Sequence, residues 1–123
     1  MQFDFNEQQN EFRQEARRFL AAECSTDRVR KVLEGGGFAR ALWQGVAEMG
    51  FLGIAIPEEH GGLGLGYLEL CGVAEEFGRA LAPLPIVSSI YLAAEAIKSF
   101  GTPEQKAAWL PRIAAGAAIG CLA

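Results

Sequence analysis

Residues able to do chemistry are scarce in this chain of 123 residues, and the first group of them surrounds its only histidine. His60 directly follows Glu58 and Glu59, and these residue types can bind a metal ion or exchange a proton. Three neighbouring loop residues rarely converge on one ion, and no further ligand cluster occurs in the sequence. The favoured interpretation is therefore a solvated loop, and we predict no metal ligand and no catalytic residue in this chain.

A pair of serines is the second group, because Ser88 and Ser89 interrupt an otherwise apolar segment. Neither has a histidine or lysine at a spacing that would activate its hydroxyl, so this chain alone cannot supply a hydrolase triad. In one interpretation the hydroxyls bond to backbone groups in the first turn of a helix. In the other, this part of the helix faces a cavity or a ligand. The residues alone leave both interpretations open.

Glycines are concentrated between residues 61 and 66, after an apolar run and before a helical pattern. This order superficially resembles a dinucleotide-binding loop, but residues 57–60 separate the apolar run from the glycines, and no second strand follows. A corner between two helices is therefore the favoured interpretation. It begins at Gly50, which can cap the preceding helix in a left-handed conformation while Phe51 packs back toward Val46. The corner residues expected in the core are Phe51, Leu52, Ile54 and Ile56.

The composition limits the class of protein. Half of the residues are apolar, 21% are charged and the net charge is −4, which is typical of a globular domain and argues against a nucleic-acid partner. The three cysteines lack C-x-x-C spacing and are interpreted as reduced thiols. The longest apolar run is too short to span a bilayer, and the first residues match neither a secretory leader nor a transit peptide. We therefore expect a soluble, cytoplasmic protein.

The elements that hold these groups are helical by their apolar spacing. They are expected at about 7–23, from Ser25 or Thr26 to the glycines at 35–37, at about 38–49, from 67 to Pro83, at about 85–99, and from Pro103 onward. Asn6 and Gln9 form a capping box at the first start, and Thr102 and Gln105 suit the last start. Pro111 is expected to kink or restart the last helix. Short connections then predict an all-α fold, an antiparallel bundle of about five to six helices.

Two stretches point beyond such a bundle. The helix at 85–99 is apolar around nearly its whole circumference, so it should be buried at the centre of the bundle or under another domain. Residues 117–123 read as an opening β-strand, and a lone strand cannot satisfy its own hydrogen bonds. We therefore expect a helical domain at 1–116 and the opening strand of a missing β-domain at 117–123, completed by a longer chain or another polypeptide.

Four stretches together resemble the N-terminal helical domain of acyl-CoA dehydrogenases: FDFNEQQNEFRQEARRFL, LWQGVAEMGFLGIAIPEEHGGLGLG, VAEEFGRALAPLP and FGTPEQKAAWLPRIAAGAAIGCLA. The resemblance implies that a β-domain and a C-terminal four-helix domain follow, with FAD bound mainly by regions absent from this chain. It also implies an enzyme that is commonly a tetramer. A C-terminal glutamate would take the α-proton of an acyl-CoA while the β-hydride passes to the flavin. Electrons would leave through an electron-transfer flavoprotein.

The resemblance also assigns residues. The helix with Ser88, Ser89 and Leu92 resembles the one that lines the end of the acyl-chain pocket, which makes these three the expected substrate-binding residues. Leu122 resembles the start of the strand whose continuation touches the flavin, and it is the expected cofactor-binding residue. The chain stops before the Thr-Glu-Pro and Gly-Ser-Asp stretches that the family uses near the flavin, and it lacks the domain with the base. His60 stands where an aromatic residue is more usual.

The resemblance thus implies the N-terminal part of an FAD-dependent acyl-CoA dehydrogenase, which desaturates the α,β-bond of an acyl-CoA thioester. As an isolated segment it should be inactive, supplying acyl-pocket wall and subunit packing. Two alternatives remain. One is a stand-alone helical interaction module that kept the fold and lost the enzyme. The other is a related flavoenzyme on the same scaffold, such as an oxidase or a dehydrogenase of acyl carrier protein thioesters.

Overall fold

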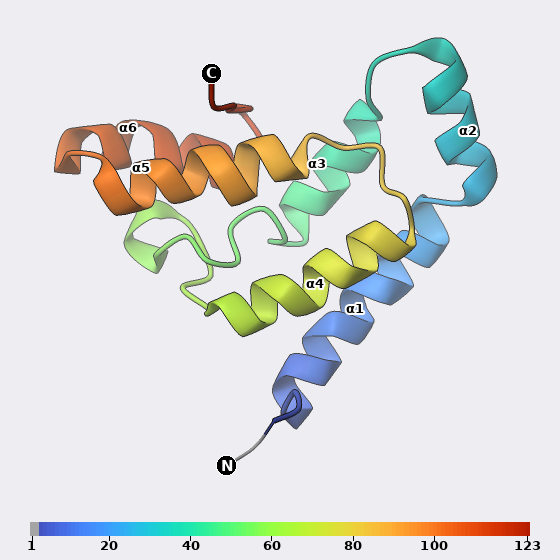
Figure 1. Cartoon of the computed structure of the whole chain (residues 1–123), viewed down its shortest axis with the longest axis horizontal. Coiled ribbons are helices and arrows are strands. Elements are labelled where there is room, and N and C mark those ends of the chain that lie inside the picture. Colours follow the sequence, from blue (N-terminus) through green and yellow to red (C-terminus); the bar gives the residue numbers. More distant parts are fainter. Residues whose placement is uncertain (1–2) are drawn as a thin grey trace.

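Every regular element is helical in the computed structural model, which describes residues 3–123 (Figure 1). The α-helices are α1 (Glu7–Glu23), α2 (Thr26–Gly35), α3 (Arg40–Glu48), α4 (Tyr67–Arg79), α5 (Glu95–Phe100) and α6 (Pro103–Ala114). A 3₁₀ turn, η1 (Glu58–His60), lies in the corner, and a π-helix, η2 (Val87–Ala94), runs directly into α5. The predicted all-α fold is confirmed.

Side-chain caps fix where the first and last α-helices begin. The Asn6 side chain accepts the Gln9 N–H at 2.8 Å, and the Gln9 side chain accepts the Asn6 N–H at 2.9 Å. Thr102 and Gln105 form the same reciprocal pair, at 3.2 and 2.9 Å. The first N–H groups of a helix have no partner within it, so these bonds define both starts where the sequence predicts them.

The helices pack mainly as two groups, α1 with α4 and η2–α5 with α6, and α3 and the corner lie between them (Figure 1). The Gln9 amide binds Glu69 near the starts of α1 and α4, and the Cys24 thiol contacts the Ala80 carbonyl near their ends. These two helices therefore run in the same direction, because the long connection through α2, α3 and the corner returns the chain to the start of α1. The antiparallel order that we expected holds for α5 and α6, which are joined only by Gly101 and Thr102.

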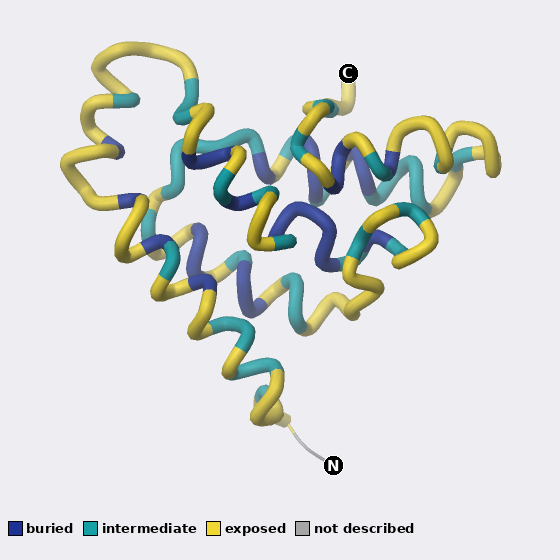
Figure 2. Tube along the Cα trace, turned by 180° about the vertical axis from the view of Figure 1, so that it is seen from behind, coloured by how far each residue is buried: buried dark blue, intermediate teal, exposed yellow. Residues whose placement is uncertain are grey.

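The corner between α3 and α4 fills the centre of the molecule (Figure 2). Gly50 has a φ of +83°, and the Phe51 N–H donates to the Val46 carbonyl at 3.2 Å, which is the predicted helix cap. The four apolar corner residues are at most 3% exposed: Phe51, Leu52, Ile54 and Ile56. Burying each such side chain contributes about 1.5–3 kcal/mol, so the corner is a main part of the core.

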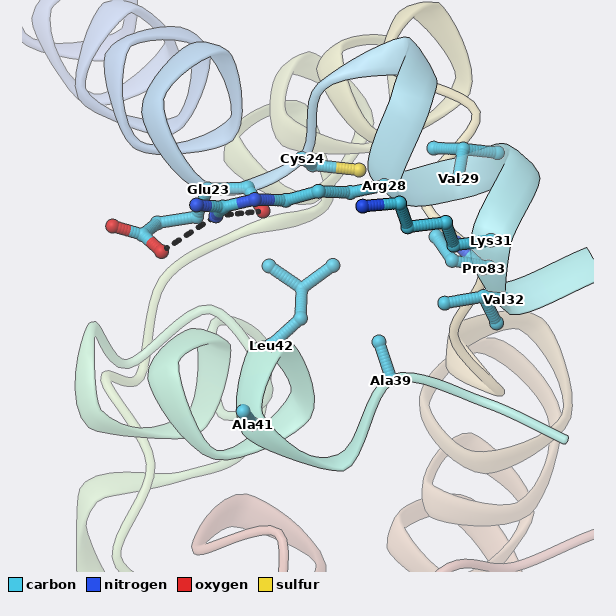
Figure 3. A pocket seen from close by; sticks show the side chains of 10 residues that line it. All are labelled: Glu23, Cys24, Arg28, Val29, Lys31, Val32, Ala39, Ala41, Leu42 and Pro83. Atoms are coloured by element: carbon cyan, nitrogen blue, oxygen red, sulfur yellow. Dashed lines mark hydrogen bonds and ion pairs between the residues drawn. The ribbon is translucent and has the colours of Figure 1, made fainter. Parts of the chain in front are cut away.

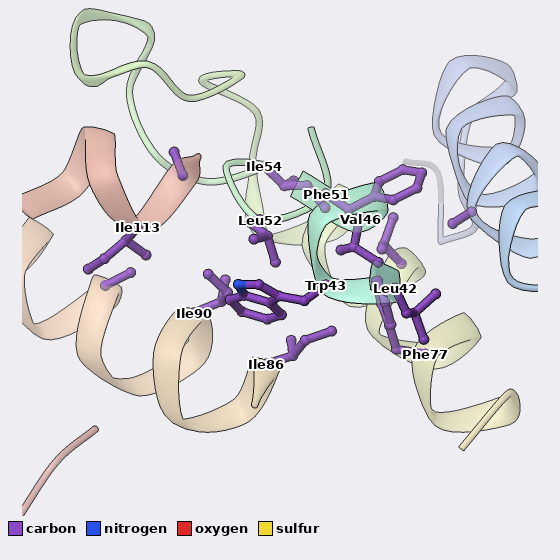
Figure 4. Packing of buried hydrophobic residues seen from close by; sticks show 14 of the residues in the cluster. Leu42, Trp43, Val46, Phe51, Leu52, Ile54, Phe77, Ile86, Ile90 and Ile113 are labelled. Atoms are coloured by element: carbon purple, nitrogen blue, oxygen red, sulfur yellow. The ribbon is translucent and has the colours of Figure 1, made fainter. Parts of the chain in front are cut away.

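Two aromatic residues connect the parts of this core (Figure 4). The Phe51 ring packs edge-on against Phe12 of α1 and Phe77 of α4, with centroid distances of 5.6 and 6.3 Å. Trp43 of α3 lies close to Ile90 of η2 in the same buried cluster. Edge-on aromatic pairs contribute about 0.5–1.5 kcal/mol beyond their burial, so the Phe51 ring holds the corner against α1 and α4, while Trp43 connects α3 with η2.

In the last quarter of the chain, one expectation differs from the structure and another stays untested. Pro111 does not restart the last helix, because α6 continues without interruption to Ala114, and a kink at this residue stays a prediction. The hydrogen bond that this proline removes belongs to the Ala107 carbonyl, and because Ala107 is exposed, water can replace the missing donor. Residues 117–123 form no strand within the described chain, which offers them no partner strand. Their role as the opening strand of a missing β-domain, after a helical domain at 1–116, stays a prediction.

Candidate functional site

The helix at 85–99 begins as a π-helix rather than as the α-helix that its composition predicts. Backbone hydrogen bonds of a π-helix reach back five residues, a rare pattern that is frequent at functional sites. From Glu95 the helix continues as α5. This change of helix type within one element makes η2 a candidate functional site.

Only one side of η2 is covered by the described chain. The residues on the covered side are at most 7% exposed: Ile86, Ser89, Ile90, Ala93 and Ala94. On the open side, Val87 is 61% exposed and Leu92 is 43% exposed. Burial on all sides is therefore not achieved within residues 3–123, and a position under further polypeptide stays a prediction. We call the side with Val87, Ser88, Tyr91 and Leu92 the open face.

The two neighbouring serines have different surroundings. The Ser88 hydroxyl donates to the Pro85 carbonyl at 3.3 Å, which is the local bond of the first interpretation. Ser89 is completely buried, and its Oγ accepts the Gly120 N–H at 3.2 Å. Ser88 is thus accessible on the open face together with Leu92, whereas Ser89 points into the domain. Substrate contacts of all three residues stay predictions.

A groove between α4 and η2 adjoins the open face. It has a volume of about 340 Å³. Its lining is mainly apolar: Tyr67, Leu70, Cys71, Ala74, Tyr91 and Glu95. At the polar end, the Tyr67 hydroxyl donates to Glu95, and Lys98 pairs with Glu95 at 2.9 Å. Partial burial opposes ionisation of Glu95, but the hydrogen bonds from Tyr67 and Lys98 outweigh it and lower the pKa of this carboxyl. The groove is therefore mainly apolar, and its polar end holds the ion pair between Glu95 and Lys98.

Tyr91 reports whether this groove is dry. Burial, with a smaller contribution from Cys71, raises the pKa of Tyr91 to about 12. We expect an ultraviolet absorbance of tyrosinate near pH 12 during an alkaline titration of the folded chain, and Tyr91→Phe should remove it. Because the neutral phenol is favoured in the folded state, stability should fall between the ordinary tyrosine pKa of about 10 and pH 12. Titration of Tyr91 at the ordinary tyrosine value would show that water fills the groove.

The segment after α6, residues 116–123, is called the tail. It lies against the helices at two points, where the Trp43 indole N–H donates to the Gly116 carbonyl at 3.0 Å and where Gly120 donates to Ser89. Beyond these points Leu122 is 58% exposed. The tail thus carries Leu122 out of the helical core, and a contact of this residue with a cofactor stays a prediction.

A family model described as the N-terminal domain of acyl-CoA dehydrogenase matches residues 6–117. The chain belongs to the acyl-CoA dehydrogenase family. It is 35% identical to the acryloyl-CoA reductase (NADH) of Anaerotignum propionicum, covering 100% of this chain and 31% of that protein. It is 33% identical to the mitochondrial isovaleryl-CoA dehydrogenase of Solanum tuberosum, covering 97% of this chain and 30% of that protein. The solved acyl-CoA dehydrogenase of Bacillus anthracis, complexed with FAD, has a TM-score of 0.86 at 28% identity, covering 95% of this chain and 20% of that one.

The family resemblance that the sequence stretches indicate is thereby confirmed. The chain spans about a third of the length of the curated relatives it matches. The matched region of this acyl-CoA dehydrogenase domain includes η2, its open face and the adjoining groove, whereas Leu122 lies beyond the end of the family model at residue 117.

A second hollow, of about 370 Å³, lies between α2 and α3 of the acyl-CoA dehydrogenase domain (Figure 3). None of its lining residues comes from η2 or the tail. Arg28 at its rim is paired with Glu23 at 3.2 Å, and burial raises the pKa of the Cys24 thiol, which keeps the sulfur protonated and unreactive at neutral pH. Neither Arg28 nor Cys24 therefore offers a free reactive group to this hollow.

The first group of candidate residues, around His60, lies in η1 of the corner. His60 is only 16% exposed, so the loop is less solvated than we expected, and its Nε2 lies 3.8 Å from Glu59. Within residues 3–123 no group of three possible metal ligands gathers. In the same range, no helix combines the length and the hydropathy that crossing a bilayer requires.

Proposed function

We propose that this chain is the N-terminal part of an FAD-dependent acyl-CoA dehydrogenase and that the open face of η2 forms a wall of the acyl-chain pocket. The observation that carries the proposal is the uncovered apolar side of η2, in a domain that belongs to this family. An acyl chain has no polar groups beyond its thioester, so Leu92 and Val87 would bind it by excluding water. Ser88 adds one hydroxyl at the edge of this wall.

The chain's own contribution to FAD is small. When bound, this cofactor accepts the hydride from the β-carbon of the acyl group. Among residues 3–123 the only candidate contact is Leu122, an exposed apolar side chain at the end of the tail. An apolar side chain suits contact with the flat flavin ring but cannot hold its phosphates. The proposed FAD site is therefore built mainly from other parts of the protein, and the general base also lies outside this chain.

The same proposal names the partners: the rest of the dehydrogenase subunit, an acyl-CoA, other subunits of a tetramer and an electron-transfer flavoprotein. Large exposed apolar side chains outside η2 support the need for further protein contacts. Leu68, on α4, is 61% exposed, and Phe100, at the end of α5, is 89% exposed. Surfaces of this kind are typical of contacts with other polypeptide.

The first test is the colour and mass of the natively purified protein. The 123-residue chain alone should be colourless and should reduce no dye with acyl-CoA. A complex with the polypeptide that supplies the β-domain, whether the continued reading frame past Ala123 or a separate chain, should be yellow and of higher intact mass. A yellow, active chain of 123 residues would contradict the proposal that the FAD site and the general base lie mainly outside this chain. A stop codon after Ala123 and no flavin-carrying partner would favour the interaction module instead.

The second test is a substitution on the open face in the yellow complex. Leu92→Phe adds volume to the proposed wall, so kcat/KM should fall about tenfold or more for long acyl-CoA substrates and little for short ones. Leu33→Phe is the matched control, because Leu33 is 72% exposed on α2. If Leu92→Phe and Leu33→Phe change kcat/KM equally for substrates of every chain length, η2 does not form a wall of the acyl-chain pocket.

A further inference from the structure

The tail is held more firmly than a free C-terminal segment. The N–H groups of Ala117 and Ala118 both donate to the Arg112 carbonyl, at 2.8 and 3.1 Å. Gly116 has a φ of +73°, and a Cβ there would lie 3.0 Å from the Cβ of Ala47. The tail therefore leaves α6 through a turn that only glycine fits, close against α3.

The next fixed point is Gly120, which lies on η2. Its N–H donates to Ser89 Oγ at 3.2 Å, and a Cβ at this position would lie 2.5 Å from the Cβ of Ala93. Ser89 and Ala93 are four residues apart on the covered side of η2, so together they form a slot that admits backbone but no side chain. In the described chain, residues 121–123 form no hydrogen bond.

We infer that Ser89 is a positioning residue that fixes the path of the tail across η2. A completely buried hydroxyl is costly unless it is hydrogen-bonded, and the partner recorded for Ser89 Oγ is the Gly120 N–H. Alanine would fill the same space without an acceptor, which would leave the Gly120 N–H unpaired. The serine therefore sets the register at which residues 121–123 leave the domain.

This assignment gives Ser89 a different task from its neighbour, and its consequence for the reaction rests on the proposed function. Ser88 faces the proposed acyl chain, whereas Ser89 connects the other side of the same helix to the segment proposed to lead toward the flavin. A change on the acyl wall would thus alter substrate affinity. A change at Ser89 would alter how the tail is aligned, and so affect kcat more than KM.

The inference is tested by amide hydrogen exchange on the 123-residue chain, so the outcome does not depend on acyl-CoA or FAD. In the wild type, the Gly120 amide should exchange at least about tenfold more slowly than the amides of residues 121–123. Ser89→Ala should abolish most of this difference while leaving Ala117 and Ala118 protected. Ser88→Ala is the control, since it loses only the local bond to Pro85.

Two results would overturn the inference. One is an unprotected Gly120 amide in the wild type, which needs no variant and so remains decisive if Ser89→Ala fails to fold. The other is equal protection of Gly120 in Ser89→Ala and the wild type. A second pair of variants checks the slot: Gly120→Ala should release the tail, and adding Ala93→Gly should restore protection at residue 120. If the wild-type complex with the β-domain polypeptide proves to be colourless, the proposed function is contradicted, but the hydrogen-exchange result for Gly120 is not affected.

Discussion

Replacing Gly62 by alanine is expected to destabilise the chain by about 3 kcal/mol or more, because the new methyl group has no space. Its Cβ would lie 1.9 Å from the Ile56 carbonyl oxygen and 2.5 Å from the carbonyl carbon. Both atoms belong to the backbone, so no side-chain rotation can relieve the overlap. The corner that contains Ile56 would have to move, and this corner fills the core. Urea unfolding followed by tryptophan fluorescence measures the change.

Gly78→Ala is the matched control for this prediction. Gly78 lies within α4, and a Cβ there would meet nothing within 4 Å. Alanine restricts the unfolded chain more than glycine does, so this variant should stabilise the fold by about 0.5–1 kcal/mol. Wild-type stability of Gly62→Ala would show that Gly62 does not pack against the Ile56 backbone.

The corner also explains why a loop defect would reach the site. The Leu63 N–H donates to the Gly53 carbonyl at 2.8 Å, and the Leu65 N–H donates to Ile54 at 2.8 Å, so the glycine run is bonded onto the apolar run. Lys98, which closes the polar end of the groove, also donates to the Ala55 carbonyl at 3.4 Å. Displacing the corner would therefore disturb the groove as well as the core.

Local structure was largely predictable from sequence, because its causes lie within a few residues. The Asn6–Gln9 box and the Gly50 cap each depend on neighbours no more than five positions away. The parallel course of α1 and α4 was not predictable in this way. It depends on contacts such as that between Gln9 and Glu69, which are 60 positions apart.

The candidate site shows the same division. Apolar composition correctly singled out the helix at 85–99, but it did not indicate that η2 is a π-helix or that one side stays open. Ser89 was noticed as a hydroxyl in an apolar segment, yet its partner is the backbone of Gly120, 31 positions later. Backbone groups carry no sequence signature, so no residue pattern could have distinguished a slot for the tail from a ligand contact.

Glu76 is a buried carboxylate between α1 and α4 that the sequence analysis does not predict. We expect Glu76→Gln to destabilise the fold by about 2–3 kcal/mol. Glu76 is 2% exposed and accepts hydrogen bonds from Arg13 at 3.1 Å and from Arg17 at 2.9 Å. Glutamine has the same shape but neither the charge nor two acceptor oxygens. Both arginines retain contact with water, which limits the loss.

The same carboxylate predicts the direction of the pH dependence. The hydrogen bonds from Arg17, then those from Arg13, outweigh burial and lower the pKa of Glu76 below its ordinary value. Its contribution to stability is therefore complete above the unfolded-state pKa of about 4.3 and is lost as the pH falls toward the lower folded-state pKa. The difference in unfolding free energy between wild type and Glu76→Gln should be largest near neutral pH and should shrink on acidification.

Glu75→Gln is the matched control, because the adjacent Glu75 side chain is 59% exposed and pairs with Arg13 at the surface. Exposed ion pairs contribute little, so this variant should change stability by about 0.5 kcal/mol or less. Urea unfolding of the three proteins at neutral and acidic pH separates the effects. Wild-type stability of Glu76→Gln at neutral pH, or a loss of stability that does not shrink on acidification, would mean that the carboxylate charge does not hold α1 against α4.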